Sequence, residues 1–170
     1  MYIYDFIQGL IIGGTLIIAI GPQNLFVIQQ GLKKSYVFTV TLFCSLSDSL
    51  LIVIGIYLSN YIVQINPSII GIIKVLGGIW LIFYGLNKVI KLNQIKDINK
   101  KLNIINEYGK VLITLFLITY ANPHVYLDTI ILLGSLSTNF NDQFSFGVGA
   151  ISASFLFFFS LGYMLSLIHI

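Results

Sequence analysis

Two acidic residues, Asp48 and Asp128, lie inside long apolar segments of this 170-residue chain. A carboxylate at the centre of a membrane helix costs at least ~2.5 kcal/mol on insertion scales, so such residues are rare without a function. Carboxyl groups at this depth line cavities or proton routes, where they bind a cation or exchange a proton. The structural alternative for Asp48 is a hydrogen bond with Ser45, Ser49 or a neighbouring helix.

A group of polar residues, Asn122-Pro123-His124, comes just before Asp128. Asn is a good N-cap and Pro a good first residue, so this triplet predicts that one helix ends and another begins. His124 and Asp128 are four residues apart and share a helix face, where His124 could contact a substrate or form a helix-end hydrogen bond. No nucleophile at recognisable spacing completes a catalytic set, which argues against an enzyme.

The same pattern occurs near the N-terminus, where Gly21-Pro22-Gln23-Asn24 interrupts an apolar segment. A single proline can be a simple kink in a membrane helix. Two breaks, each beside polar side chains, favour discontinuous helices whose ends form a binding site. The helix-break residues are then Gly21, Pro22 and Pro123. The candidate residues for substrate binding or coupling are Gln23, Asn24, Asp48, Asn122, His124 and Asp128.

The elements that position these residues must be membrane helices, because 57% of the chain is hydrophobic and only 9% is charged. A soluble domain of this size cannot bury so much apolar surface. We predict an all-α integral membrane protein, a polytopic helix bundle of five spans with discontinuous first and fourth helices. The predicted spans cover residues 4–31, 36–59, 68–90, 111–136 and 144–168.

Composition also excludes several classes of function. The formal net charge of +3 comes from a few loops and does not indicate nucleic-acid binding. The single cysteine, Cys44, excludes an intramolecular disulfide and a cysteine-based metal site. Asp48, Asp128 and His124 are too few and too distant in sequence to predict a metal site, and we expect no cofactor.

Small residues predict where helices approach closely. Gly9 and Gly13 form a small-xxx-small pair on the first span, and a longer stripe on the third span predicts tight packing against a partner. Lys74 lies on that stripe about 9 Å inside the span, where it extends to the headgroups or pairs with Asp128. Residues 60–67 are expected to form a loop. The stripe consists of Gly71, Lys74, Gly78 and Gly85.

Lysine distribution predicts the orientation. Lys33, Lys34 and the segment 88–110 fall on one side of the membrane, which is cytoplasmic by the positive-inside rule. The N-terminus, residues 60–67 and residues 137–142 are then outside.

The two breaks also indicate a repeat, because Pro22 and Pro123 begin corresponding helices of two possible three-span units. An odd number of spans per unit inverts the second unit relative to the first, which is a 3+3 inverted repeat. Residues 1–90 form the first repeat, 91–109 a Lys-rich cytoplasmic loop and 110–170 a second repeat whose last helix is missing. A span that ends at the terminus without a basic anchor favours truncation.

Three stretches carry a resemblance to a known family: Gly-Pro-Gln-Asn-Leu-Phe-Val at 21–27, Leu-Ser-Asp-Ser-Leu-Leu-Ile at 46–52 and Asn-Pro-His-Val-Tyr-Leu-Asp-Thr at 122–129. Together with Gly-Gly-Ile-Trp-Leu-Ile-Phe-Tyr-Gly at 77–85, they resemble the LysE family of amino-acid exporters, and most closely its lysine/arginine branch. The last of the three stretches is the most specific part of the resemblance.

The resemblance implies a secondary transporter that exports lysine or arginine from the bacterial cytoplasm, coupled to a proton gradient or the membrane potential. It also implies a multi-pass protein of the cytoplasmic membrane and a homo-oligomer. Family members have a sixth helix, so an inactive truncated fragment is one alternative. Distant relatives of the family move metals, so a divalent-metal exporter that uses the same Asp, Asn and His residues is another.

Such a substrate needs acceptors for its cations and donors for its carboxylate. Half-helix N-termini at Gln23-Asn24 and at His124 expose backbone N–H groups that suit the carboxylate. Carbonyl groups near Ile20 and Ala121 suit the α-ammonium, and Asp48 or Asp128 suits the side-chain cation.

Overall fold

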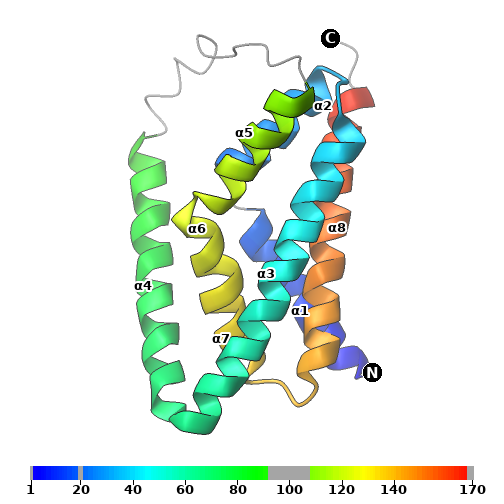
Figure 1. The fold of residues 1–170 in the computed structure, drawn as a ribbon. Coiled ribbons are helices and arrows are strands. Elements are labelled where there is room, and N and C mark those ends of the chain that lie inside the picture. The colour runs from blue at the N-terminus through cyan, green and yellow to red at the C-terminus, as the bar shows by residue number, and fades with distance from the viewer. Residues whose placement is uncertain (1, 19–20, 92–107, 168–170) are drawn as a thin grey trace.

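The computed structural model describes residues 2–18, 21–91 and 108–167, and every element in these ranges is a helix (Figure 1). The predicted all-α class is therefore confirmed. The predicted linker at 91–109 falls almost entirely outside the described residues, as do the last three residues of the chain.

Both predicted helix breaks are present. The first apolar segment forms α1 (Ile3–Ile17) and α2 (Pro22–Leu32), which are bent by 83° relative to each other. The fourth forms α5 (Tyr108–Tyr120) and then a second half-helix, bent by 58°. In each case proline is the first residue of the new half-helix. The N–H group at this position makes no hydrogen bond within the helix, so proline, which has no N–H, is well tolerated there.

The second half-helix after the break at Pro123 is itself irregular. It consists of α6 (Pro123–Tyr126), a π-helical turn η2 (Leu127–Leu133) and α7 (Gly134–Ser137). Wide π-helical turns are rare and occur often at functional sites. Asp128 lies in this π-helical turn.

The remaining helices are unbroken: α3 (Val37–Ile65), α4 (Pro67–Lys91) and α8 (Gln143–Leu167). Among the described residues, α3 and α8 are each long and apolar enough to cross a membrane, and the two bent pairs raise the number of candidate spans to four. The predicted third span corresponds to α4, which runs along the side of the bundle in Figure 1.

The predicted loop at 60–67 is wrong. Helix α3 continues to Ile65, α4 begins at Pro67, and Asn66 alone lies between them. The Asn66 side chain makes this tight reversal possible, because its Oδ1 accepts the backbone N–H of Ser68 at 3.0 Å. Pro67 then starts α4 with its φ already suited to a helix.

Glycines bring helix backbones into contact, as the pair on the first span predicted. A Cβ atom added to Gly9 would collide with the Phe146 carbonyl oxygen, and one added to Gly13 would lie 2.9 Å from the Ala150 Cα, so α1 and α8 touch backbone to backbone. Helix α3 meets α7 in the same way, since a Cβ on Gly134 would collide with the Gly55 carbonyl oxygen. These contacts hold α1 against α8 and α3 against α7, the helices that lie next to the two breaks.

Two expectations for α4 are wrong, namely close packing through Gly71 and Gly78 and the pairing of Lys74 with Asp128. Within the described part of the chain, no atom of another helix lies within 4 Å of the Cβ position at Gly71 or Gly78. Lys74 does not pair with Asp128, because its Nζ donates to Asn139 Oδ1 at 2.7 Å and to Thr138 Oγ1 at 3.3 Å. Two neutral side chains of the turn after α7, Thr138 and Asn139, therefore accept hydrogen bonds from the Lys74 ammonium.

Two apolar clusters fill the bundle interior. The first joins α2, the start of α3, α5 and the later part of α8, with Phe26, Val27, Val40 and Leu115 among its buried members. The second joins α3, η2 and the start of α8 through Ile52, Leu133, Phe146 and Ala150. The polar site described next borders both clusters, because Ile17 and Phe158 belong to the first, and Ile52 and Leu133 to the second.

Candidate functional site

A single pocket contains all six polar residues that the sequence selected. Gln23, Asn24, Asp48, Asn122, His124 and Asp128 line it together with Gly21. Residues more than a hundred positions apart in the chain therefore meet where the two helix breaks face each other. Pro22 and Pro123 begin the half-helices that carry these side chains.

At the first break, the Asn24 side chain reaches back across the gap between the half-helices. Its Nδ2 donates to the Ile17 carbonyl oxygen at 2.9 Å, which satisfies a carbonyl at the end of α1. Gln23 is 5% exposed, and its side-chain amide lies beside the carboxyl group of Asp48 and the thiol of Cys44 on α3. The N-cap residue Gly21 provides no side chain, and no described side chain caps this end of α2.

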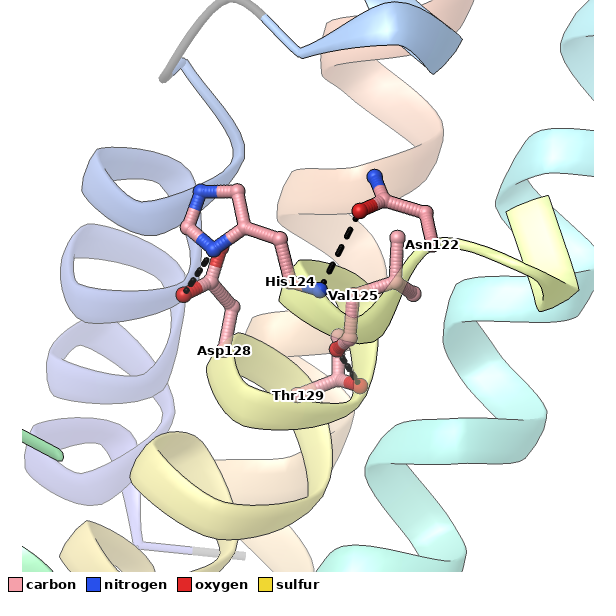
Figure 2. A network of polar contacts seen from close by, with 5 residues as sticks. All are labelled: Asn122, His124, Val125, Asp128 and Thr129. Carbon is pink, nitrogen blue, oxygen red and sulfur yellow. Dashed lines mark hydrogen bonds and ion pairs between the residues drawn. The ribbon is translucent and has the colours of Figure 1, made fainter. Parts of the chain in front are cut away.

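At the second break, the half-helices are joined differently. Asn122 acts as a cap, since its Oδ1 accepts the backbone N–H of His124 at 3.1 Å (Figure 2). The Tyr126 hydroxyl donates to the Tyr120 carbonyl oxygen at 2.7 Å, so this side chain crosses the break. The Tyr120 hydroxyl in turn donates to Ser47 Oγ at 3.1 Å and links the break to α3.

His124 and Asp128 face each other one helical turn apart (Figure 2). The distance from His124 Nδ1 to Asp128 Oδ1 is 3.4 Å, which is an ion-pair distance if the imidazole is protonated. The expectation that the two side chains share a helix face is confirmed. On the following residue, the Thr129 hydroxyl donates to the Val125 carbonyl oxygen at 2.6 Å.

Asp48 is 4% exposed and is held from another helix. The Ser154 hydroxyl of α8 donates to Asp48 Oδ2 at 3.2 Å. Ser45 and Ser49, named as alternative partners, instead donate to backbone carbonyl groups one turn earlier in α3. Of the structural alternatives for Asp48, the neighbouring helix is therefore correct.

Sequence reasoning missed Ser154 and Phe158. Ser154 has no local signal in the sequence, yet Asp48 and Ser154 each lie eleven residues after the first residue of their helix. A repeat alignment could have paired them. Phe158 is 1% exposed and lines the pocket, although it lies in a run of similar phenylalanines that the sequence does not tell apart.

The pocket combines two carboxyl groups, one imidazole and three side-chain amides. No lysine lies among its lining residues in the described part of the chain. In the same ranges, no three His, Cys, Asp or Glu residues are placed to hold one metal ion. Carboxyl groups can bind a cation and amide N–H groups can bind a carboxylate, so the lining can hold an organic cation that also carries an anionic group.

Comparison with known proteins gives consistent matches. The family model of the LysE type translocator matches residues 15–169. An arginine exporter protein ArgO from Klebsiella pneumoniae (strain 342) is 37% identical over 165 residues, which are 95% of this chain and 77% of that protein. ArgO from Escherichia coli (strain K12) is 36% identical with the same coverage, and ArgO from Salmonella enteritidis PT4 is 35% identical over 92% of this chain and 75% of that protein. No solved structure matches.

Proposed function

Because the chain belongs to the LysE family of translocators, we propose that it exports basic amino acids, with arginine as the main substrate and lysine as a second one. The names of its relatives support arginine. The family and the apolar helices support a multi-pass protein of the bacterial cytoplasmic membrane.

The observation that carries the proposal is the meeting of Asp48 and Asp128 in one pocket beside two helix breaks. A basic amino acid carries two cations and one carboxylate, and a site with little water must supply countercharges for them. Buried carboxyl groups supply the negative charges, and half-helix ends supply backbone N–H and C=O groups. Buried carboxyl groups and interrupted helix ends are both costly within a membrane, and binding of a basic amino acid explains why both are present.

Export also requires energy, because a cation that leaves a cell with an inside-negative potential moves uphill by about 2.3 kcal/mol per 100 mV. We propose that a proton entering in exchange offsets this cost. Asp48, Asp128 and His124 are the ionisable groups of the pocket that could carry the proton. The apolar clusters on the two sides of the pocket would open in turn, so that the substrate meets one surface at a time.

The proposed orientation places Lys33 in the cytoplasm and the turn after α7 outside. In Figure 1 the end of α2 and this turn lie at opposite ends of the bundle. Cysteine variants Lys33→Cys and Asn139→Cys in intact cells test the orientation with a thiol reagent that cannot cross the membrane. We expect labelling at 139 alone; labelling at 33 alone would reverse the assignment.

Arginine counterflow tests the function directly. Proteoliposomes that contain the purified chain and unlabelled arginine should accumulate labelled arginine, and external lysine should compete. Alanine and manganese ions serve as controls for neutral substrates and divalent metals. Counterflow of manganese without arginine would favour the metal exporter, and absence of any counterflow would contradict an active carrier.

A further inference from the structure

Asp48 is a buried carboxyl group whose partners in the described part of the chain are neutral. The Ser154 hydroxyl donates to its Oδ2 at 3.2 Å, and the Gln23 amide lies beside it. Asp128 differs, because His124 lies 3.4 Å away and becomes a cation when it is protonated. A buried charge without a partner of opposite sign is strongly destabilising. A charged Asp48 therefore needs a cation that these neutral partners do not supply.

Phe158 brings an aromatic ring into the wall of the same pocket. Among the lining residues that the structure describes, it is the only Phe, Tyr or Trp, and the other phenylalanines of residues 155–159 do not line the pocket. Phe158 lies four residues after Ser154 on α8, so the ring and the donor to Asp48 share one side of this helix. Helix α8 thus presents an aromatic ring and a bond to the unpaired carboxyl group together.

Packing from behind fixes the position of this ring. Phe158 is a buried member of the first apolar cluster, which also contains Phe26, Val27 and Cys44. The ring of Phe157 stands at 73° to it, with the two centroids 5.4 Å apart. A side chain that is held by its neighbours in this way keeps its position when a ligand binds, as a selective site requires.

A carboxyl group near an aromatic ring suits a guanidinium group better than an ammonium group. A guanidinium group is planar and weakly hydrated, so it can donate to a carboxylate in its plane and stack on a ring with its face. An ammonium group is a compact, strongly hydrated charge. The attraction between a cation and a ring is largest where water is excluded, as in a buried pocket.

From this geometry we propose that Asp48 and Phe158 form the subsite for the guanidinium group of arginine, and that Phe158 is a residue that selects arginine over lysine. Asp48 accepts the guanidinium N–H groups, and the ring of Phe158 packs against the guanidinium plane. Asp128 then faces the α-ammonium. The inference rests on the proposed function and adds a direction to it: the substrate side chain lies between α3 and α8.

Competition with arginine counterflow tests the subsite in the wild type. Citrulline keeps the head group and the planar end of arginine, but its urea group is neutral. It should compete at least about tenfold less strongly than arginine, since the charge that pairs with Asp48 is missing. Lysine keeps the charge without the planar group and should compete at least about threefold less strongly than arginine.

Variants of Phe158 connect the preference for arginine to the ring. Phe158→Leu keeps an apolar side chain and should reduce the ratio of arginine to lysine competition at least about threefold, mainly by weakening arginine. Trifluorophenylalanine at position 158 keeps the shape of the ring but withdraws electrons from its face, so it should lower the ratio in the same direction. Phe155→Leu is the matched control, because Phe155 is half-buried on the same helix and does not line the pocket. It should keep the wild-type ratio.

Several results would overturn the subsite. An unchanged ratio of arginine to lysine in either ring variant would show that Phe158 only packs and closes the pocket, and an equal change in Phe155→Leu would assign the effect to packing of α8. Citrulline that competes as well as arginine would remove Asp48 from the subsite. In each case wild-type arginine counterflow leaves the proposed export function intact, whereas its absence would contradict that function instead. If Phe158→Leu does not fold, the trifluorophenylalanine variant, which preserves the shape of the ring, decides.

Discussion

The two carboxyl groups of the pocket are held in different ways. Asp48 lies in the unbroken helix α3, and a neutral hydroxyl from another helix, Ser154, donates to it at 3.2 Å. Asp128 lies in a π-helical turn just after a break, and its partner at 3.4 Å is a titratable residue of the same half-helix, His124. One carboxyl group depends on the packing of two helices, and the other on a local helical turn.

This difference separates two tasks that one transporter must perform. A carboxyl group fixed between packed helices keeps its position and can define where a ligand group binds. A carboxyl group on a broken helix beside a histidine can change its position and its protonation during a cycle. We therefore expect Asp48 to act mainly in substrate binding and Asp128 to act in both binding and coupling.

The largest effect is expected when either charge is removed. Asp48→Asn and Asp128→Asn keep the shape of the side chain, and Ser154 can still donate to an amide oxygen at position 48. Each variant should lower arginine counterflow by about two orders of magnitude, because loss of one partner of a buried charge pair costs about 2–5 kcal/mol. Counterflow in proteoliposomes with matched protein content is the measurement. Near wild-type rates for both variants would assign the two residues a structural role only.

The next effect concerns His124 and distinguishes the two carboxyl groups. His124→Asn keeps a hydrogen-bonding group near the position of Nδ1 but cannot titrate. Counterflow should fall about tenfold, and its pH dependence between about pH 5.5 and about pH 8 should flatten, because the ordinary pKa of histidine lies in that range. An unchanged pH profile would show that the proton route does not use the pair of His124 and Asp128.

The contrast between a local helical turn and a contact between distant helices also explains what the sequence could predict. The breaks at Pro22 and Pro123 and the pairing of His124 with Asp128 depend on local chemistry, namely the missing proline N–H and the i, i+4 spacing. They were predicted and are present. The prediction of a membrane protein followed from composition alone, because a soluble domain of this size could not bury so much apolar surface.

Two of the errors involve contacts between distant segments. Ser154 is 106 residues from Asp48, and Lys74 is 65 residues from Asn139, so neither pairing has a local signal. The loop expected at 60–67 is absent because Asn66 and Pro67 reverse the chain in one step, which composition does not reveal. Close helix packing through Gly9 could be predicted from residue size, but the choice of α8 as the partner could not.

A smaller effect is expected for Ser154. Ser154→Ala removes the donor to Asp48 and should raise the arginine concentration at half-maximal counterflow by about fivefold, which corresponds to about 1 kcal/mol for one hydrogen bond. The maximal rate should change less, since the charge on Asp48 remains. Ser152→Ala is the control, because the Ser152 hydroxyl donates only to the Val148 carbonyl oxygen of its own helix. Equal effects of the two variants would show that helix packing, and not the bond to Asp48, is responsible.

The smallest effect is expected for Asp142, a carboxyl group outside the pocket that ties the start of α8 to the N-terminus. Its oxygens accept hydrogen bonds from the Ser145 side chain and backbone N–H, and its own N–H donates to Asp5 Oδ2 at 2.8 Å. The hydrogen bonds from Ser145 hold the pKa of Asp142 below its ordinary value of 3.8.

A carboxyl group with a lowered pKa stabilises the fold above its unfolded-state pKa, and that contribution is lost as the pH falls through the lower folded-state value. Asp142→Asn should therefore leave arginine counterflow at neutral pH unchanged. Its melting temperature in detergent should lie slightly below that of the wild type above about pH 5, because Asn still caps a helix. The two melting temperatures should converge as the pH falls below about 3.8. A gap that does not shrink as the pH falls below about 3.8, or a counterflow defect at neutral pH, would contradict the separation of this carboxyl group from the two that line the pocket.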